Sequence, residues 1–351
     1  MATPGKGAEA PAAAPAARCR WVDDRILAVT IPTPFAVGDV NAYVVLGRVP
    51  TLIDVGPGGR SGREALEAGL AAAGLGWDDL AQVVITHTHA DHFGLLRRWP
   101  GRQQPPVLAH RWGARHFRGG EDPERAGFFQ AFGRAAGVPA GLAGSMLQGL
   151  HLLMAAEPDV PVARWLEDGD EVEMGDDRWL VLHTPGHAQS QVCLYRERDG
   201  LLISSDHLLP AISSNALLEP PPLDERGRPV RPEPPRSLVD YRRSLRRVRP
   251  LPVRLCLPGH GEPFAGHREL IDRRLAGMAD RARQILEALQ ARGGRATLYG
   301  LAVDLFGRGD PGHLLLALSE VHGHVEWMEA EGWVRREPEP GGSGVLMVTA
   351  E

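Results

Sequence analysis

The chain has 351 residues, 43% of them hydrophobic and 24% charged, and its net charge is −5 with neutral histidines. This length is enough for a sizeable core and two domains of unequal size, and the charge gives no general reason to expect a polyanionic partner. The sequence holds a single lysine, Lys6, near its Ala- and Pro-rich start. Lysine Schiff-base chemistry and a lysine-dependent phosphate loop are therefore excluded from the folded part.

The cysteines and the apolar runs indicate a cytoplasmic protein that does not span a membrane. Cys19, Cys193 and Cys256 lie far apart and lack CxxC spacing, so we expect neither a disulfide framework nor a thiolate zinc site. No run of about 18 apolar residues predicts a transmembrane helix. Residues 1–20 lack the leucine-rich core of a signal peptide and are predicted to form a disordered tail, with a short targeting segment as the alternative.

The first part of the folded chain alternates strands with helical spacing. Residues 26–32 and 40–46 predict neighbouring strands, and residues 51–58 predict a strand that runs into a glycine-rich turn. Residues 61–74 have helical spacing, and the apolar run within 82–86 predicts a buried strand. This alternation indicates a layered α/β architecture.

Residues 111–157 differ from their surroundings, since they are rich in Ala, Gly, Phe, Leu and Met and are broken at Pro123 and Pro139. Two helices are predicted, over 125–136 and 140–155. We expect this insertion to cap the active site; the alternative is a helical layer that only completes the core. Its large apolar side chains would accordingly wall a pocket or pack its own core: Phe128, Phe129, Phe132, Met146, Leu147, Leu150 and Met154.

Strands return after the insertion. They are predicted over 178–183, 191–195 and 201–205. The proline-rich residues 219–236 predict an extended loop, followed by a helix over 237–249 and a last strand over 253–257. These elements complete a predicted catalytic domain over residues 21–266.

The remaining segment, residues 267–351, has a helical pattern followed by a hairpin. Helices are predicted over 267–291, Thr297–Phe306 and Pro311–Glu331. Three helices and a hairpin predict a winged-helix domain. Its third helix contains four glutamates and neither lysine nor arginine, so contact of this helix with nucleic acid is electrostatically unfavourable. We therefore predict that the module serves dimerisation or helps to shape the site.

Histidine and aspartate side chains gather where predicted strands end. The stretch Thr86-His87-Thr88-His89-Ala90-Asp91-His92 follows one strand, and further candidates lie in TPGH, after ISS and in PGHG. Neutral imidazole and carboxylate are typical ligands of zinc and similar divalent ions. So many polar groups within a few residues cannot all be buried and paired cheaply. We therefore predict a metal site made by His87, His89, Asp91, His92, His187, Asp206 and His260.

These motifs resemble those of the metallo-beta-lactamase-fold hydrolase superfamily, in the same order and over about residues 20–265. The resemblance implies an αββα sandwich of two mixed sheets flanked by helices, and two metal sites. It implies that Asp54, in LIDVG, hydrogen-bonds the ligand loop, with a simple turn cap as the alternative. It assigns His87, His89 and His187 to one metal, Asp91, His92 and His260 to the second, and Asp206 to both.

The resemblance points to the glyoxalase II and nuclease side of the superfamily. Zinc beta-lactamases often carry arginine where His92 stands and cysteine where Asp206 stands, and flavodiiron proteins have glutamate in place of His89. Relatives commonly have glycine where Ser205 precedes the bridging aspartate. The C-terminal module, together with the residues around His207, resembles the beta-lactamase-like protein 2 group, whose members include single-strand ribonucleases.

Two divalent ions about 3.5–4 Å apart can hold a bridging hydroxide at neutral pH, which attacks a carbonyl carbon or a phosphorus. We expect zinc, with iron and manganese as alternatives. Asp91 and His207 are predicted to act in catalysis, His207 by approaching the substrate; otherwise it packs within its loop.

Several functions compete, and we favour a hydrolase of small-molecule thioesters or esters. The first alternative is a single-strand ribonuclease, in which arginines on one side of the 237–249 helix would hold phosphates, although a solvated charged face is the commoner explanation. The second is a persulfide dioxygenase with one iron. A winged-helix regulator is disfavoured by its acidic third helix. The arginines that would hold phosphates in the ribonuclease alternative are Arg242, Arg243, Arg246 and Arg247.

Overall fold

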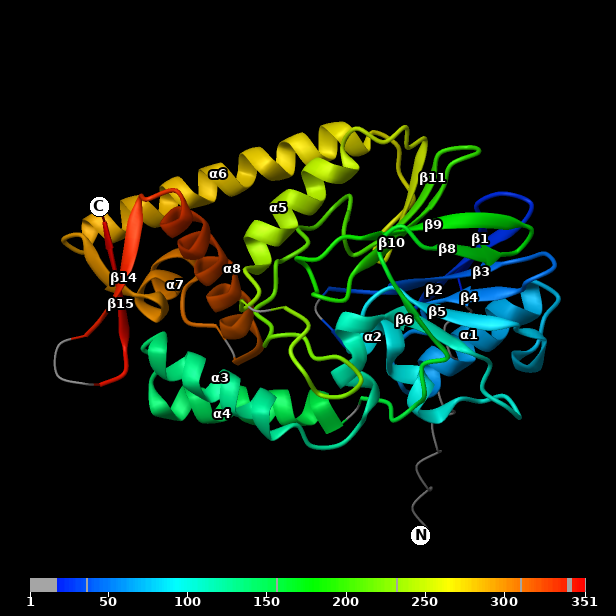
Figure 1. The fold of residues 1–351 in the computed structure, drawn as a ribbon, viewed down its shortest axis with the longest axis horizontal. Helices are drawn as coiled ribbons and strands as arrows, with labels where there is room; N and C mark the ends of the chain where they lie inside the picture. The colour runs from blue at the N-terminus through cyan, green and yellow to red at the C-terminus, as the bar shows by residue number, and fades with distance from the viewer. Residues whose placement is uncertain are drawn as a thin grey trace, which may run out of the picture.

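The computed structural model describes residues 18–350 except positions 36, 156, 232, 310 and 340–342. One part of the molecule, at the right of Figure 1, is a pair of β-sheets that face each other, with helices on their outer sides. The first sheet has seven strands in the order β1-β2-β3-β4-β5-β6-β7, antiparallel from β1 to β4 and parallel from β4 to β7. Their bounds are Arg18–Trp21, Ile26–Ile31, Val40–Val45, Thr51–Ile53, Gln82–Ile85, Val107–His110 and Arg164–Leu166.

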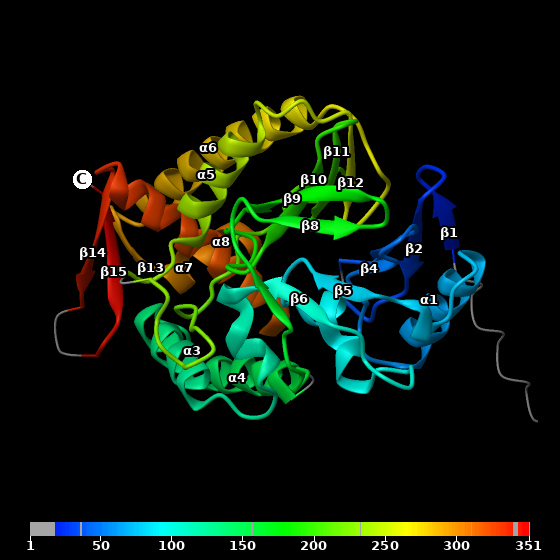
Figure 2. The same ribbon diagram turned by 45° about the vertical axis from the view of Figure 1, so that its right-hand side comes forward.

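The second sheet has five strands in the order β12-β11-β10-β9-β8 (Figure 2). Strands β11 and β12 are parallel, and the other neighbours are antiparallel. In chain order the bounds of β8 to β12 are Glu171–Met174, Asp177–His183, Val192–Arg196, Leu201–Ser205 and Leu255–Pro258. Short helical turns link the strands of the first sheet: Trp77–Asp79, α2 (Ala90–Phe93), Gly94–Arg98 and Arg111–Phe117.

Apolar side chains hold the layers together. Trp179 and Leu194 belong to a buried cluster that fills the space between the two sheets. Because successive strand residues point to opposite faces, Tyr195 instead joins a cluster on the outer face of the second sheet, against α5 (Ser237–Val248). The outer face of the first sheet packs on α1 (Arg60–Ala72) in the same way. These layers form the αββα sandwich that the resemblance predicted.

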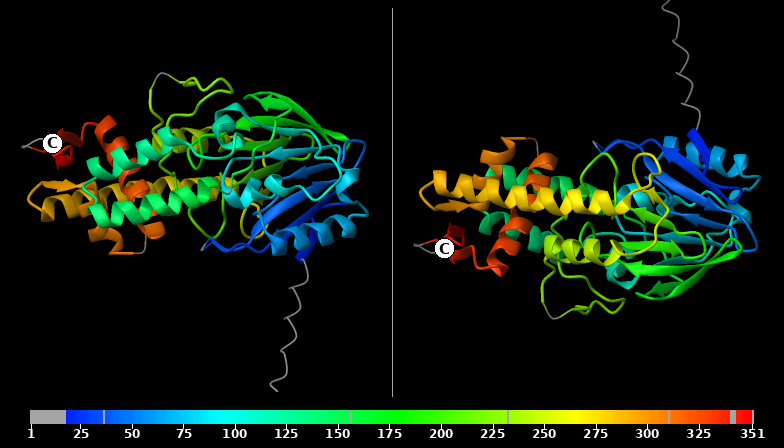
Figure 3. Two further views of the ribbon diagram at one scale, coloured as in Figure 1. Left: turned by 90° about the horizontal axis from the view of Figure 1, so that it is seen from below. Right: turned by 90° about the horizontal axis from the view of Figure 1, so that it is seen from above.

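The chain after residue 266 forms helices and a small third sheet at the end of the molecule away from the two central sheets (Figure 3). The predicted helices and hairpin are present, and Thr297 Oγ1 caps α7 by accepting a hydrogen bond from the Gly300 amide at 3.0 Å. The winged-helix assignment stays a prediction. The elements are α6 (His267–Ala291), β13 (Arg295–Thr297), α7 (Leu298–Phe306), α8 (Pro311–Ala330), β14 (Val334–Pro338) and β15 (Leu346–Ala350), with sheet order β13-β15-β14.

The insertion contains the two predicted helices, α3 (Pro123–Ala135) and α4 (Ala140–Ala155), which lie side by side next to α8 (Figure 1). Phe129, Met146 and Leu150 are buried in one cluster with residues of the C-terminal helices. The apolar residues of the insertion therefore serve the core, which was the alternative to the predicted pocket wall. The two helices and the C-terminal segment form one continuous helical body.

Two further features concern the ends of the chain and membranes. The predicted tail, residues 1–20, lies outside the described residues up to position 17, but its last three residues belong to β1 and pair with β2. That part of the tail prediction is wrong, because Arg18 to Trp21 form a regular antiparallel edge strand. Within the described residues, no helix is both long and apolar enough to cross a membrane.

Arg196 ties the two sheets together from β10. Its guanidinium is 1% exposed, lies 5.0 Å from the ring centre of Trp179, and donates to Asp23 Oδ2 at 2.7 Å. Asp23 follows β1 in the other sheet, while Asp177 and Asp199 accept further hydrogen bonds at 2.9–3.2 Å. The arginine thus pairs with three carboxylates beside the core.

We expect Arg196→Ala to lower the free energy of unfolding by about 3 kcal/mol, because a buried charge partner is removed and three carboxylates lose their cation. Arg198→Ala is the matched control, since that arginine is 60% exposed and pairs with Asp177 alone. In urea unfolding, the control should lose no more than about 1 kcal/mol of its free energy of unfolding. Equal losses in the two variants would contradict the structural role given to Arg196.

Candidate metal centre

The seven predicted ligands come together at one edge of the paired sheets. The ligand loop, residues 86–92, follows β5, while His187 lies between β9 and β10, Asp206 follows β11 and His260 follows β12. The ends of four strands thus converge, and the ligand role of the side chains stays a prediction. Within each of three overlapping groups the ligand atoms lie within 4.8 Å of one another: His87, His89 and His187; His87, His92 and Asp206; and Asp91, His92 and His260.

Two of these groups have the separations expected around single ions. His89 Nδ1 lies 3.0 Å from His87 Nε2 and 3.0 Å from His187 Nε2. In the other group, His260 Nε2 lies 3.4 Å from Asp91 Oδ2. Ligand atoms about 2.0–2.2 Å from a common zinc ion are themselves separated by roughly 3–3.5 Å in a tetrahedral arrangement. The groups are therefore already close to binding geometry.

Asp206 joins the two groups. Its Oδ2 lies 3.4 Å from His187 Nε2 and 3.5 Å from His260 Nε2, and its Oδ1 lies 3.5 Å from His92 Nε2. The carboxylate thus faces histidines of both groups at once. A single side chain in this position can contribute an oxygen to each of two ions.

The nitrogen of each histidine that faces away from the centre has a partner in the chain. His187 Nδ1 contacts the Asn215 carbonyl at 2.9 Å, His260 Nδ1 the Asp39 carbonyl at 2.8 Å, and His87 Nδ1 the Thr86 hydroxyl at 3.2 Å. Such partners fix the tautomer and the orientation of a metal-binding imidazole. The rings are therefore held with one nitrogen directed to the centre.

Asp54 supports the ligand loop as the resemblance implied. Its Oδ2 lies 2.8 Å from His92 Nδ1 and accepts from the Thr86 hydroxyl at 2.7 Å, while its Oδ1 accepts from the Thr86 amide at 2.8 Å. Asp54 has a φ of 57° and Ser205 a φ of 43°, a region that residues other than glycine seldom occupy. Local backbone strain therefore accompanies two positions that shape the centre.

The electrostatics of the centre suit divalent cations. Burial opposes ionisation of Asp206, but His92 and its neighbouring imidazoles outweigh it and hold the pKa of this carboxyl well below its usual range. Burial lowers the pKa of His187 to about 4, helped by the nearby His89. At His260 the carboxylates of Asp206 and Asp91 overcome burial and raise the pKa to about 9. Ionised carboxylates and imidazoles thus share one buried site, which is the donor set that zinc and related metals take.

Several buried polar atoms at the centre are suited to bind a cation. No residue that the structure describes forms a hydrogen bond with His92 Nε2, His260 Nε2 or Asp206 Oδ1. Buried polar atoms are normally satisfied, and leaving one unpaired costs free energy. All three belong to predicted ligands and face the centre, so the residues present fit metal ions.

The catalytic role of His207 stays a prediction, and its position gives it no support. The side chain is 0% exposed, and its ring packs edge-on against Tyr241 with the ring centres 5.5 Å apart. Burial, followed by the nearby His187, lowers its pKa to about 3. Packing within its loop was the alternative; the ring is buried, and its aromatic neighbour Tyr241 lies in α5.

Glu219 is a residue of the centre that the sequence did not reveal. Its Oε1 lies 3.6 Å from His89 Nε2, the nitrogen of that ring that faces away from the other histidines, and its Oε2 accepts from the Gln189 amide at 2.8 Å. Burial alone would raise its pKa, but the contacts with His89 lower the pKa to about 2. In the sequence, Glu219 is only an acidic residue at the start of a proline-rich loop. This gives no information about the residue that it contacts in the folded protein.

We expect Glu219→Gln to weaken metal binding about 10- to 100-fold, because His89 loses the anion that orients its ring. The measurement is competition for the metal against a chromophoric chelator. Glu329→Gln is the control, since Glu329 pairs with Arg336 in the C-terminal segment. Unchanged metal affinity in Glu219→Gln would show that the contact does not position His89.

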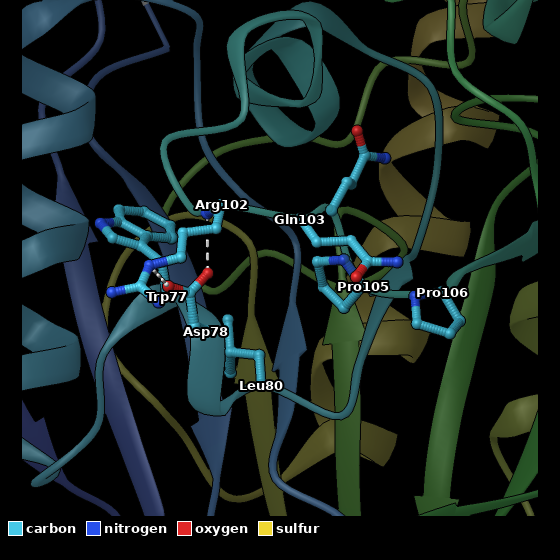
Figure 4. Close-up of a pocket in the computed structure, with 8 residues that line it drawn as sticks. Trp77, Asp78, Leu80, Arg102, Gln103, Pro105 and Pro106 are labelled. Atoms are coloured by element: carbon cyan, nitrogen blue, oxygen red, sulfur yellow. Dashed lines mark hydrogen bonds and ion pairs between the residues drawn. The ribbon is translucent and has the colours of Figure 1, made fainter.

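A surface pocket of about 440 Å³ lies at the opposite edge of the first sheet (Figure 4). It is lined by residues just before β5 and β6, whereas the metal ligands follow the ends of strands. Its charged groups pair with each other: the Arg102 amide donates to Asp78 Oδ1 at 2.7 Å, and Arg102 Nε lies 3.6 Å from Asp78 Oδ2. This pocket is therefore separate from the candidate centre.

Comparison with known proteins agrees with this geometry. Residues 36–260 match the metallo-beta-lactamase superfamily. The chain is 34% identical over 311 residues, 87% of its length and 92% of the relative's, to the probable metallo-hydrolase YqjP of Bacillus subtilis. It is 28% identical over 65% of its length to the acyl-coenzyme A thioesterase MBLAC2 of Gallus gallus, covering 74% of that protein.

Among solved structures, a metallo-beta-lactamase family protein from Thermus thermophilus superposes with a TM-score of 0.75 and 29% identity. The match covers 93% of this chain and 98% of that one, so it includes the C-terminal helices and third sheet as well as the sandwich. The fold and the extent of the match agree with the family model. The chain belongs to the metallo-beta-lactamase superfamily.

Proposed function

We propose that the protein is a dinuclear metal-dependent hydrolase of small-molecule thioesters. The observation that carries the proposal is the position of Asp206, which faces both groups of histidines at 3.4–3.5 Å. The ions would be held as the resemblance implies, with Asp206 between them and zinc as the expected metal. When bound, such a pair of ions supplies a nucleophilic hydroxide at neutral pH and positive charge for the oxyanion that develops at the substrate carbonyl.

The residues of the protein hold the metal centre rigid and partly shield it from water. The side chain of His89 is 22% exposed and that of Asp91 12%, while His92 is fully buried. Substrate therefore reaches the centre from the side of His89 and Asp91. Because every ligand histidine is anchored through its second nitrogen, little reorganisation is needed during the reaction, which favours electrostatic stabilisation of the transition state.

Support for a thioester comes from the relative named as an acyl-coenzyme A thioesterase, which matches 65% of this chain. The ribonuclease alternative depended on the arginines of α5, and most of them are already engaged. Arg242 is buried, with its guanidinium 3.5 Å from the ring centre of Trp327, and Arg247 donates to Asp168 Oδ2 at 2.9 Å. Arg243 lies 3.7 Å from Asp240. This helix face offers little free positive charge to a polynucleotide.

The test is a turnover assay of metal-loaded protein on acyl-coenzyme A, a glutathione thioester, an aryl ester and single-stranded RNA. We expect metal-dependent thioester hydrolysis that stops with a chelator and returns with added metal, while RNA stays intact. RNA cleavage without thioester turnover would reject the proposal. Oxygen consumption with a persulfide substrate, in protein loaded with iron, would favour the dioxygenase alternative instead.

A further inference from the structure

A second cleft, of about 560 Å³, adjoins the ligand loop. One of its lining residues is Ala90, which stands between His89 and Asp91 in the chain. The remaining wall comes from the turn before α1, the first turns of α1, the helical turn Gly94–Arg98 and the loop after β2. The cleft therefore reaches the ligand loop between His89 and Asp91, two ligands of that loop that are partly exposed.

The cleft is rich in arginine. Its lining carries four arginines, Arg60, Arg63, Arg97 and Arg98, against two glutamates. Arg63 pairs with one of these glutamates at 3.8 Å, and Arg97 donates to a backbone carbonyl. Arg60 and Arg98 form no ion pair with any residue that the structure describes, and both are exposed. Two guanidinium groups are thus free to bind an anion, in a protein whose net charge is negative.

The start of α1 adds to the positive potential of the cleft. Gly58, Gly59 and Arg60 line it, and the glycine at the N-cap cannot satisfy the first amides of this 13-residue helix with a side chain. The first turn, which lies wholly within the described residues, contains no acidic side chain. Unsatisfied amides and the helix dipole attract phosphate groups at such a position, and arginine binds them bidentately.

We infer that this cleft binds the phosphate groups of a coenzyme A thioester whose acyl carbonyl lies at the metal centre. The inference rests on the proposed function and deepens it by naming the carrier. In coenzyme A the pantetheine arm separates the thioester from the pyrophosphate and the 3′-phosphate, so phosphate-binding groups are needed near the centre but not in it. The half-buried ring of Phe35 lines the same cleft and offers a surface on which the adenine can stack.

The alternative carriers have different chemistry. Glutathione contains carboxylates but no phosphate, and it would leave a cleft of this size largely unused. An acyl carrier protein presents one phosphate diester next to a large protein surface. Coenzyme A brings several phosphate charges and an aromatic base together, which matches the two free arginines, the helix start and Phe35.

The first experiment measures binding without turnover. Adenosine 3′,5′-bisphosphate is titrated calorimetrically into metal-loaded wild type, Arg60→Ala and Arg98→Ala. We expect each substitution to weaken binding roughly ten-fold, as loss of one charge-assisted contact should. Arg102→Ala, an exposed arginine at the opposite edge of the sheet, should bind like wild type. Equal affinity in all four proteins, or no binding by wild type, would overturn the inference.

The second experiment measures selectivity. We compare kcat/KM for an acyl-coenzyme A with that for the N-acetylcysteamine thioester of the same acyl group, which lacks phosphates. Wild type should prefer the coenzyme A thioester about 100-fold, and Arg60→Ala and Arg98→Ala should each reduce this ratio about ten-fold, roughly additively. An unchanged ratio in the arginine variants would reject the cleft as the carrier site.

The two experiments separate the inference from the proposed function. Hydrolysis of both thioesters with no preference would leave the thioesterase standing and reject the coenzyme A site. Binding of the bisphosphate that depends on both arginines, without turnover of any thioester, would support the phosphate site and reject the proposed function. Cleavage of single-stranded RNA, weakened by the same substitutions, would assign the cleft to RNA phosphates and overturn the inference.

Discussion

Asp206→Ala should lose most of its bound metal and at least about 100-fold of its metal-dependent turnover. Removing an outer-sphere partner of a metal site typically costs 10- to 100-fold, and Asp206 faces both groups of predicted ligands directly. The substitution also removes the carboxylate that faces His92 Nε2 and His187 Nε2. Metal content by mass spectrometry and turnover on an acyl-coenzyme A would be measured on the same preparation.

Asp272→Ala is the matched control for this experiment, because Asp272 is exposed on α6 and pairs with Arg249. It should retain wild-type metal content and turnover. If Asp206→Ala kept its full metal content and wild-type turnover, this result would contradict the bridging role assigned to the carboxylate.

Gly186→Ala is expected to lower the free energy of unfolding by about 3 kcal/mol and to weaken metal binding, because no space exists for a methyl group. Gly186 has a φ of 140°, and an added Cβ would overlap the Cα and Cβ of Tyr241 and lie 2.6 Å from its backbone nitrogen. Tyr241 is in α5, so either this helix or the loop that carries His187 must shift. Urea unfolding and chelator competition would report the two effects separately.

The same substitution elsewhere in the chain provides the control. An added Cβ at Gly141 or Gly149 in α4 would meet no atom within 4 Å, so Gly→Ala there should be neutral or stabilising by up to about 1 kcal/mol. If Gly186→Ala were as stable as these controls and bound metal normally, the close approach of α5 would not determine the position of His187.

Long apolar or amphipathic segments could be predicted from the sequence, and short ones could not. The runs that became β2, β3 and β5 and the helices α5 and α6 have lengths and periods that few other structures satisfy. Strands β7 and β13 have three residues each, and β1 is exposed at an edge, so their sequences carry almost no pattern. These strands form because a neighbouring strand offers hydrogen bonds, which depends on the tertiary structure.

The metal ligands could be predicted because their residue types and their positions after strands are both unusual. Glu219, Arg60 and Arg98 could not, since each is a common charged residue whose partner is set by how a loop or helix packs. The role of Gly186 could not be predicted either, because its contact with Tyr241 requires knowledge of where α5 lies. Residues that act through contacts with distant parts of the chain are the hardest to predict from the sequence.

The most direct test of the proposed function is turnover of an acyl-coenzyme A as metal-free protein is titrated with zinc. The structure offers two ligand groups joined by Asp206. We therefore expect hydrolysis to rise with added metal and to reach its maximum at two ions per chain. Protein that binds two ions per chain but hydrolyses no thioester would contradict it.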